Sequence, residues 1–574
     1  MNAVTPLVVG VTSHRNIPAR EVPALRQHVR ELFARLQHEF PHLPLTVLSS
    51  LAQGGDQLVA EEALQAGAKL IAPLPFAREF YARDFVDAAV RARFEALCAK
   101  AQVIELPLLA GHTRGVVALA SEQRNRQYAQ AGTFVAWHCQ LLIAIWDGKP
   151  SQHVGGTAQI VDYFLTGALP GGVGPRRDLR ARLYGGGGER LMYHLVCSRD
   201  VLEGQPAAPL KAGQALWRGP DEVSVSGAPM PQEVHKVFAY ADAFNRDAAY
   251  YARQIAATSP GIAEPETAAG GAAAPAYASV MRLFHAADWL ANLFQKRVLL
   301  AMRVIYSVAF LMGLTFAAYD NLAGQDRMLY VFLALFVVGV LMSAVAKLRG
   351  WHRKYLDYRA LAEGLRVQCY WLRAGIALDG DSGSGQDSLL QKQEMELAWV
   401  RNVMRSAGLA GQPGAEAFGE RALAGVIEEW VGDERHGELG YYRLRTRQRE
   451  HAHRANEVIG AICLLIGLGI SIMMAILMDW LSFDAKHDWI VAMAAFSIFA
   501  AVRESYAFRK ADRELIRQYR FMERVFGNAR AALDQAHNAE QQREILRALG
   551  EAALDEHVAW AVMHRQRPLE GGKM

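Results

Sequence analysis

Cysteine is scarce in this sequence, and none of it is arranged to bind a metal. The 574 residues include five cysteines, and no two of them form a CxxC pair. Structural zinc sites need closely spaced cysteine or histidine ligands, so the sequence offers no zinc framework. The odd number favours a reducing compartment, in which free cysteines are usually small core residues. These residues are Cys98, Cys139, Cys197, Cys369 and Cys463.

The chain also lacks a large net charge and a secretory signal. It carries 62 basic and 58 acidic residues, for a formal net charge of +4. Proteins that coat nucleic acids usually carry a larger basic excess, so this class is disfavoured. The first residues, MNAVTPLVVG, place a short apolar run before a glycine without a basic segment, unlike a signal peptide. We therefore expect the N-terminal domain to stay in the cytosol.

The first half of the chain alternates short apolar runs with amphipathic helical segments. Between the first two runs, Leu25, Val29, Leu36 and Phe40 keep helical spacing on one face. This alternation is typical of a parallel sheet covered by helices. We predict an α/β, Rossmann-like N-terminal domain over residues 1–256. Its expected strands are Leu7–Val11, Leu45–Ser49, Lys69–Pro73, Val103–Leu106, Leu141–Ile145 and Leu191–Val196.

Long apolar segments appear only in the second half. A membrane-spanning helix needs about 20 predominantly apolar residues, which the first three segments approach or reach. The fourth is shorter, and flanking charge supports its role as a span: if it did not cross, the arginine-rich C-terminus would lie outside. The segments are Val298–Ala318, Met328–Ala346, Val458–Met478 and Trp489–Val502.

The charges around these segments predict two transmembrane hairpins. Basic residues flank the hairpins and acidic residues dominate the two turns, which places the turns outside and the soluble parts inside. The sequence thus predicts an all-α membrane region in the bacterial inner membrane, with the N-terminal domain and the C-terminus in the cytosol. The basic residues are Lys296, Arg297, Lys347, Arg349, Arg353, Lys354, Arg503, Arg509, Lys510 and Arg513. The acidic residues are Asp320, Asp326, Asp479, Asp484 and Asp488, beside a single Arg327 and a single Lys486.

Two stretches poor in large apolar residues divide the chain further. Residues 257–276 are rich in Pro, Gly and Ala and read as a flexible linker, and residues 379–388 form a more polar one. The first hairpin module is therefore expected over 277–378, and the second, with cytosolic helices, over 389–574. Similar basic, aromatic-containing stretches follow both hairpins, at 351–371 and 508–526. They indicate an internal duplication, juxtamembrane helices near anionic headgroups, or both.

Three turns of the N-terminal domain carry candidate ligand-binding residues. Each follows an expected strand and precedes a helix, where backbone N–H groups and the helix dipole favour an anion and glycines permit close approach. Because carboxyl ends of parallel strands share one edge of a sheet, the turns should form one crevice. The first turn offers Gly10, Thr12, Ser13 and Arg15, and the second Ser49, Ser50, Gly54, Gly55 and Asp56. The third offers Trp146, Asp147, Gly148, Gly155, Gly156 and Thr157, with Arg124, Asn125 and Arg126 on the helix upstream.

Simpler roles remain open for several of these residues. Asp56 could accept a ribose hydroxyl or only cap its helix. The ring of Trp146 could stack on a base or belong to the core. Whether Glu62 or Glu79 contributes to the site also stays open.

The turns resemble those of a known superfamily. Gly10–Arg15 with SSLAQGGDQLVAEEAL resembles the strand-turn-helix of DprA/Smf-type proteins, and RNRQYAQAG, LLIAIWDG and GGTAQIVDYF resemble the nucleotide-binding region of LOG (lonely-guy) proteins. Both groups belong to the SLOG superfamily of Rossmann-like domains, and the resemblance covers roughly residues 4–200. It implies binding of a nucleotide-derived ligand, such as a cyclic nucleotide or an ADP-ribose derivative, without a required cofactor. Where LOG enzymes carry a glutamate, this chain has Ile160, so binding is favoured over turnover and no catalytic residue is assigned.

The second half resembles a doubled SLATT module, a two-helix membrane unit of bacterial conflict systems. The resemblance rests on the hairpins and on KYLDYRALAEGLRVQCYW. It implies an effector in anti-phage defence whose sensor switches a transmembrane homo-oligomer in the lipid bilayer. Arg303 is the only charged residue inside the spans, which argues against a proton-coupled transporter.

Two other functions remain as alternatives. One is a membrane-tethered, LOG-like nucleotide phosphoribohydrolase that uses Asp56 or Asp147. The other is a DprA-like single-stranded DNA-binding protein, which the balanced charge disfavours, so nucleic acid is not an expected partner.

Overall fold

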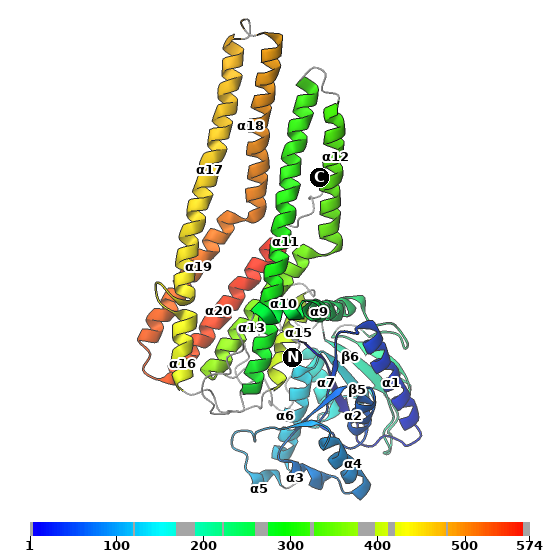
Figure 1. The fold of residues 1–574 in the computed structure, drawn as a ribbon. Coiled ribbons are helices and arrows are strands. Elements are labelled where there is room, and N and C mark those ends of the chain that lie inside the picture. Colours follow the sequence, from blue (N-terminus) through cyan, green and yellow to red (C-terminus); the bar gives the residue numbers. More distant parts are fainter. Residues whose placement is uncertain are drawn as a thin grey trace. The chain divides into compact units, whose positions relative to one another are not determined.

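The computed structural model describes residues 4–118, 121–167, 190–220, 223–258, 274–321, 327–376, 397–410, 420–477, 480 and 482–565. The chain divides into two compact units (Figure 1). The first comprises Met1–Ala287 and Leu361–Gly419, and the second Asp288–Ala360 and Glu420–Met574. The expected linker 379–388 and most of 257–276 lie outside the described residues.

The first unit contains a seven-stranded sheet in the order β4-β3-β2-β1-β5-β6-β7. Strands β1 to β6 run parallel, and β7 pairs antiparallel with β6 at one edge. All six expected strands are present, so the predicted α/β fold with a parallel sheet is confirmed. The sequence did not predict β7, because its residues ALWR contain only two large apolar side chains and end in an arginine, which marks no clear apolar run. The strands are β1 (Leu7–Ser13), β2 (Leu45–Leu48), β3 (Lys69–Leu74), β4 (Gln102–Glu105), β5 (Leu141–Trp146), β6 (Leu191–Val196) and β7 (Ala215–Arg218).

Helices cover the sheet because its central strands are apolar on both faces. On one face, Val8 and Leu142 of the strands share a core with Val135 of α6 and Phe164 of α7. The helix expected between the first two strands forms as α1, and its predicted apolar side is buried. The helices of this unit include α1 (Val22–Glu39), α2 (Gly55–Gln65), α3 (Arg78–Tyr81), α4 (Ala88–Cys98), α5 (Arg114–Val117), α6 (Glu122–His138), α7 (Thr157–Thr166), α9 (Gln232–Tyr250), α10 (Ala252–Thr258) and α15 (Ala398–Ala407).

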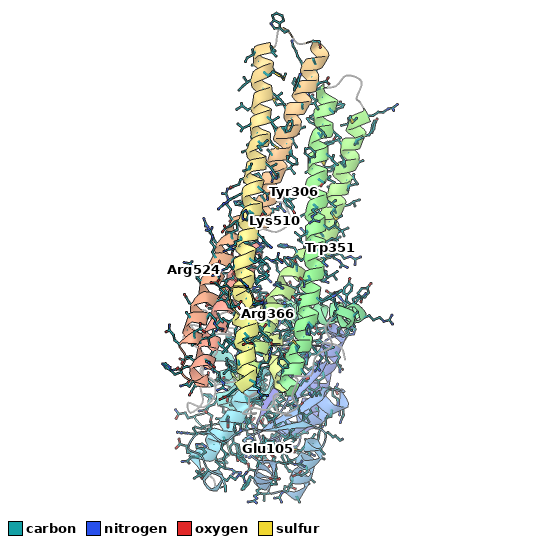
Figure 2. All side chains as sticks on the ribbon, turned by 60° about the vertical axis from the view of Figure 1, so that its left-hand side comes forward. Glu105, Tyr306, Trp351, Arg366, Lys510 and Arg524 are labelled. Carbon is teal, nitrogen blue, oxygen red and sulfur yellow. The ribbon has the colours of Figure 1, made fainter. Side chains whose placement is uncertain are left out.

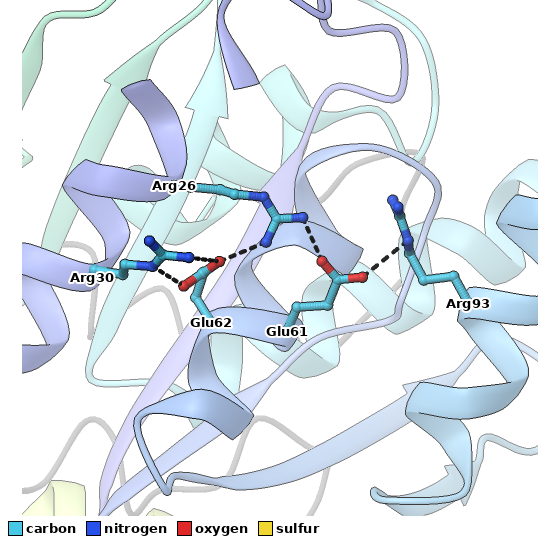
Figure 3. Close-up of polar contacts among 5 residues, drawn as sticks. All are labelled: Arg26, Arg30, Glu61, Glu62 and Arg93. Atoms are coloured by element: carbon cyan, nitrogen blue, oxygen red, sulfur yellow. Dashed lines mark hydrogen bonds and ion pairs between the residues drawn. The ribbon is translucent and has the colours of Figure 1, made fainter. Parts of the chain in front are cut away.

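A charged network fixes α1 to α2 (Figure 3). Glu62 of α2 is buried and accepts hydrogen bonds from Arg26 and Arg30 of α1, each at 2.5 Å. Glu61 accepts a bond from Arg26 at 2.5 Å and lies 3.0 Å from Arg93 of α4. Burial by itself would raise the pKa of Glu62, but the two guanidinium groups outweigh burial and lower that pKa. Glu62 therefore holds two helices together, away from the N-terminal turn of α2.

α15 joins the first unit although it lies far along the chain. The ring of Trp399 is 5.8 Å from that of Phe244 of α9, and both side chains are fully buried. The Arg405 guanidinium lies 5.4 Å from the centre of the Trp137 ring of α6. The strongly amphipathic pattern of AWVRNVMRSA explains this placement, because one face of the helix carries most of its apolar side chains.

The second unit is helical. Within the described residues, four helices are long and apolar enough to cross a membrane, and they contain the four apolar segments expected from the sequence. This confirms the predicted all-α region. The helices are α11 (Ala274–Asn321), α12 (Arg327–Leu348), α13 (Trp351–Ala374), α16 (Glu420–Val426), α17 (Gly437–Leu477), α18 (Phe483–Lys510), α19 (Asp512–Asp534) and α20 (Ala539–Arg565), of which α11 and α13 extend into the first unit.

The side chains in the apolar parts of these helices are mostly exposed. In the most apolar window of α12 no residue is buried, and in that of α17 only 11% are buried. Nitrogen and oxygen atoms instead gather toward the ends near Lys510 and Arg524 (Figure 2). A soluble bundle would bury its apolar side chains, so this pattern is the one that a lipid environment stabilises.

Candidate functional site

The candidate site lies where the direction of sheet winding reverses. From β1 the chain proceeds outward through β2, β3 and β4, and then returns to the other side of β1 with β5. In open parallel sheets, ligands bind in the crevice at the carboxyl ends of the two strands that flank such a reversal. Here those strands are β1 and β5, and the three turns singled out in the sequence follow β1, β2 and β5.

The turns after β1 and β2 pack backbone against backbone. Gly54 has a φ of 97°, and a Cβ atom there would lie 2.5 Å from the Arg15 carbonyl oxygen and 2.6 Å from that of His14. The Gly55 N–H donates to the His14 carbonyl at 3.4 Å. A Cβ atom at Gly55 would lie 2.6 Å from Cβ of Ser13. Both glycines are therefore needed for close approach of the two turns.

Asp56 is the buried acid of this crevice. It is 5% exposed and accepts a hydrogen bond from the Ser13 hydroxyl at 2.5 Å. Burial raises the pKa of Asp56 to about 7, although the Ser13 hydroxyl, the Arg15 charge and the Ala52 N–H each lower it. Its carboxyl group therefore changes charge near neutral pH, which is common for groups at functional sites.

The turn after β5 is joined to the same place. The Asp147 carboxylate lies 3.1 Å from Nε2 of His14 and accepts the Lys149 N–H at 3.0 Å. Burial opposes ionisation of Asp147, but His14 and the Lys149 N–H outweigh it and lower the pKa of Asp147. The Thr157 hydroxyl donates to the Ser13 carbonyl at 2.8 Å, which ties the N-terminus of α7 to β1. Contacts of Ser13 and His14 thus link all three turns.

A second buried cluster borders Arg15. The Arg124 guanidinium donates to the Tyr128 hydroxyl at 2.7 Å and also to Asp84 and the Val117 carbonyl. The Tyr128 hydroxyl in turn donates to Asp84 at 2.5 Å. The guanidinium of the exposed Arg15 lies 5.5 Å from the centre of the Tyr128 ring. Arg124 therefore positions Tyr128, and Tyr128 forms a wall beside Arg15.

Sequence reasoning missed Tyr128, Asp84 and His14. Tyr128 lies four residues after Arg124 on one helix, a spacing that places the two side chains together and could have identified it. His14 stands inside the GVTSHR turn and was passed over in favour of its neighbours. Asp84 lies in the one-turn 3-10 helix Ala82–Asp84, where no periodic pattern marks it.

Several predicted residues support the crevice rather than face its centre. Gly10 lies in the middle of the central strand β1, where a Cβ atom would be 2.7 Å from Sγ of Cys139. A Cβ atom at Gly148 would lie 2.5 Å from Cδ1 of Leu210, and one at Gly155 would lie 2.8 Å from the backbone of α6. The Trp146 indole is 6% exposed and donates to the Lys149 carbonyl at 3.1 Å.

The remaining predicted residues are placed as follows. Ser49 is buried, and its hydroxyl accepts the Leu51 N–H at 3.2 Å inside the second turn. Arg126 pairs with Glu122 at 2.8 Å on its own helix. Thr12 is buried in β1, and Ser50, Asn125 and Gly156 are half-buried.

No group of three or more His, Cys, Asp or Glu residues within the described ranges could hold a metal ion. Comparison of the sequence with protein-family models gives no match, and comparison with curated proteins gives no significant match. The chemistry of the site is therefore argued from its own residues.

Proposed function

We propose that this protein is a ligand-gated membrane effector whose sheet domain senses a nucleotide-derived signal. One observation carries the proposal. Three turns are joined at the reversal point of a parallel sheet, an exposed arginine stands beside them, and the same chain contains four helices of membrane-spanning length. The resemblance of the turns to SLOG domains, and of the hairpins to SLATT modules, supports the same function.

The residues of the crevice suit a phosphate with an attached aromatic group. The first turn of α7 offers backbone N–H groups behind Gly155 and Gly156, and helix N-termini bind anions. Arg15 adds a planar guanidinium that matches phosphate oxygens, next to the aromatic ring of Tyr128. We propose a cyclic nucleotide or an ADP-ribose derivative as the ligand class.

The membrane part would respond by changing the arrangement of its helices. A ligand shifts a conformational equilibrium only if it prefers one of two states, so binding must favour one arrangement of the helices. We propose that the protein resides in the bacterial inner membrane with the sheet domain in the cytosol. In this proposal a signal made during phage infection leads to permeabilisation.

Dye release from liposomes tests the proposal. Purified full-length protein in dye-loaded liposomes should cause leakage when the right member of a panel of cyclic nucleotides and ADP-ribose derivatives is added. Arg15→Ala should weaken binding of that ligand about tenfold or more, because a charged hydrogen-bond partner is lost. Arg20→Ala is the matched control, since Arg20 is also exposed and lies in the same loop. Binding without leakage by any ligand would refute gating, and equal affinity of the two variants would remove Arg15 from the site.

A nucleotide hydrolase is the second candidate, and the raised pKa of Asp56 favours it. A carboxyl group that titrates near pH 7 can act as a general acid or base. Against this candidate, Ile160 occupies the position of the LOG glutamate and is buried in contact distance of Gly132. Release of a free base or ribose phosphate, lost in Asp56→Asn while ligand binding persists, would establish turnover.

A further inference from the structure

The two membrane hairpins are structural repeats. In each, a residue in the left-handed region follows the second helix within two positions, Gly350 with φ 58° and Ala511 with φ 53°. In each, an ion pair links the first helix to the helix after this break. Asp288 pairs with Arg359 at 3.0 Å, and Glu450 pairs with Arg520 at 2.6 Å. The paired residues are 71 and 70 positions apart in the chain.

The interiors of the hairpins match in the same register. When the sequence of the first hairpin is shifted so that Asp288 aligns with Glu450, Ala301 aligns with Cys463 and Val308 with Ile470. These four apolar residues are all buried. The shift that aligns Arg359 with Arg520 aligns Gly339 with Ala500. Gly339 lies against Val308, with 3.4 Å between its ideal Cβ position and Cγ1 of Val308, and Ala500 is buried as well. α11 therefore corresponds to α17, and α12 corresponds to α18.

Within one chain the repeats meet through non-equivalent helices. α11 of the first repeat packs on α18 of the second. Ile498 fills the space over Gly313, where a Cβ atom would lie 2.9 Å from it. The rings of Phe310 and Phe499 are 5.8 Å apart.

The contact continues toward the charged ends of the helices. The rings of Tyr306 and Tyr506 are 5.5 Å apart, and the Tyr306 hydroxyl reaches the Ser505 carbonyl at 3.4 Å. A first helix thus meets a second helix, which is a head-to-tail rather than a self-complementary contact.

The corresponding surfaces of the other two helices are open. On α17, the equivalents of Tyr306, Phe310 and Gly313 are Leu468, Ile472 and Ala475, all of them exposed. On α12, the equivalents of Ile498, Phe499 and Tyr506 are Val337, Val338 and Val345. The five large side chains in these two sets are between 43% and 56% exposed. α12 and α17 also lie on the outer sides of the four helices (Figure 1).

We propose that α17 of one copy packs against α12 of a second copy and so repeats the α11–α18 contact between chains. We expect a second copy on these surfaces because their residues occupy the same repeat positions as the residues of the α11–α18 contact. The two surfaces should therefore fit each other as α11 and α18 do. Small and branched apolar side chains permit the close van der Waals packing that drives helix association in lipid. A head-to-tail contact closes into a ring when its rotation permits, and a ring can surround a pore. This assembly forms without ligand and deepens the proposed function, since it names the partner of the membrane part.

Cysteine cross-linking in membranes tests the contact. Ile472 and Val338 correspond to the facing pair Phe310 and Phe499. Two differently tagged full-length chains, one with Ile472→Cys and the other with Val338→Cys, are co-produced and oxidised without added nucleotide. We expect a disulfide-linked dimer that contains both tags and is far more abundant than in protein without introduced cysteines. The five native cysteines are buried and provide the baseline.

A matched pair on other faces of the same helices is the control. Ile466→Cys with Phe336→Cys should give only the baseline, because these exposed residues lie about half a helical turn away from Leu468 and Val338 of the proposed contact. Dimers from either single variant alone would indicate a self-complementary contact and overturn the proposal. No dimer from the 472 and 338 pair would leave these surfaces facing lipid and would also overturn it. The result is independent of leakage, so the proposed gating and this interface can fail separately.

Discussion

At the residue scale, the pKa values of two acids of the crevice are shifted in opposite directions. Asp56 is buried beside a single hydroxyl donor, and its pKa is raised to about 7. Asp147 is buried next to His14 and a backbone N–H, and its pKa is lowered. The joined turns therefore combine one carboxyl group that is largely protonated below neutral pH with one that stays ionised. An anionic ligand is repelled less when Asp56 is neutral, so binding should weaken as the pH rises through about 7.

These two pKa shifts predict that stability depends on the ionisation of Asp56 between pH 5 and pH 8, and on that of Asp147 only at more acidic pH. A raised pKa means that the contribution of Asp56 is complete below its unfolded value of about 4 and is lost as the pH rises through about 7, at about 1.4 kcal/mol per unit of pKa difference. Asp56→Asn should therefore gain stability relative to the unmodified protein between pH 5 and pH 8. Asp147→Asn should instead be destabilised by the same amount at pH 5 and pH 8. The lowered pKa of Asp147 means that its contribution is complete above the unfolded value of about 4 and is lost only as the pH falls below it.

Thermal unfolding of the full-length protein at pH 5 and pH 8 measures both effects. The comparison uses each variant's difference from the unmodified protein at the same pH, which cancels the titration of all other groups. Equal differences for Asp56→Asn at the two pH values would contradict a raised pKa at this position.

At the element scale, the contact between the turns after β1 and β2 depends on Gly54. A side chain there is strained by the positive φ and collides with two carbonyl oxygens. Gly67, at the end of α2, has a φ of 74° but nothing within 4 Å of its ideal Cβ position. Gly67→Ala should cost about 1 kcal/mol of stability from backbone strain alone. Gly54→Ala should cost about 3 kcal/mol, because displacement of packed backbone adds to this strain.

Chemical denaturation that follows the unfolding of the sheet domain measures the free energy of unfolding of both variants and can distinguish a loss of about 1 kcal/mol from one of about 3 kcal/mol. Hydrogen exchange in the first turn of α2 should also rise in Gly54→Ala and remain unchanged in Gly67→Ala. If both variants lose the same stability, the two turns do not pack as closely as the structure indicates.

Elements with a long periodic pattern could be predicted from the sequence, and irregular ones could not. The six parallel strands and α1 follow directly from apolar runs and helical spacing. Within the site, glycines and charged residues at strand ends identified the turns, because parallel strands bring their carboxyl ends to one edge. Asp84 was missed because it belongs to a single turn of helix, and its role depends on contacts with α6. The assignment of α15 to the first unit was also out of reach, since only tertiary packing of Trp399 reveals it.

At the scale of the whole molecule, the hairpins predict which segments face each side of a membrane. Trp480, in the turn between α17 and α18, is 88% exposed, and Leu202, in the loop after β6, is 96% exposed. In spheroplasts, Trp480→Cys should react with a membrane-impermeant maleimide. Leu202→Cys should react only after the membrane is permeabilised, because the basic residues that flank the hairpins predict a cytosolic sheet domain. Reaction of both variants in intact spheroplasts, or of neither, would contradict the proposed topology.

Because the two hairpins belong to one chain, they can carry different side chains at equivalent positions. In a ring of identical single hairpins, every hairpin would carry the same side chain at a given depth. Here Arg303 of α11 aligns with Leu465 of α17. In the proposed ring a guanidinium would therefore alternate with an isobutyl group around the circumference. Compared with a ring in which every hairpin carries an arginine, such alternation halves the number of cations in the hydrocarbon layer. A cation at the centre of that layer costs about 3 kcal/mol.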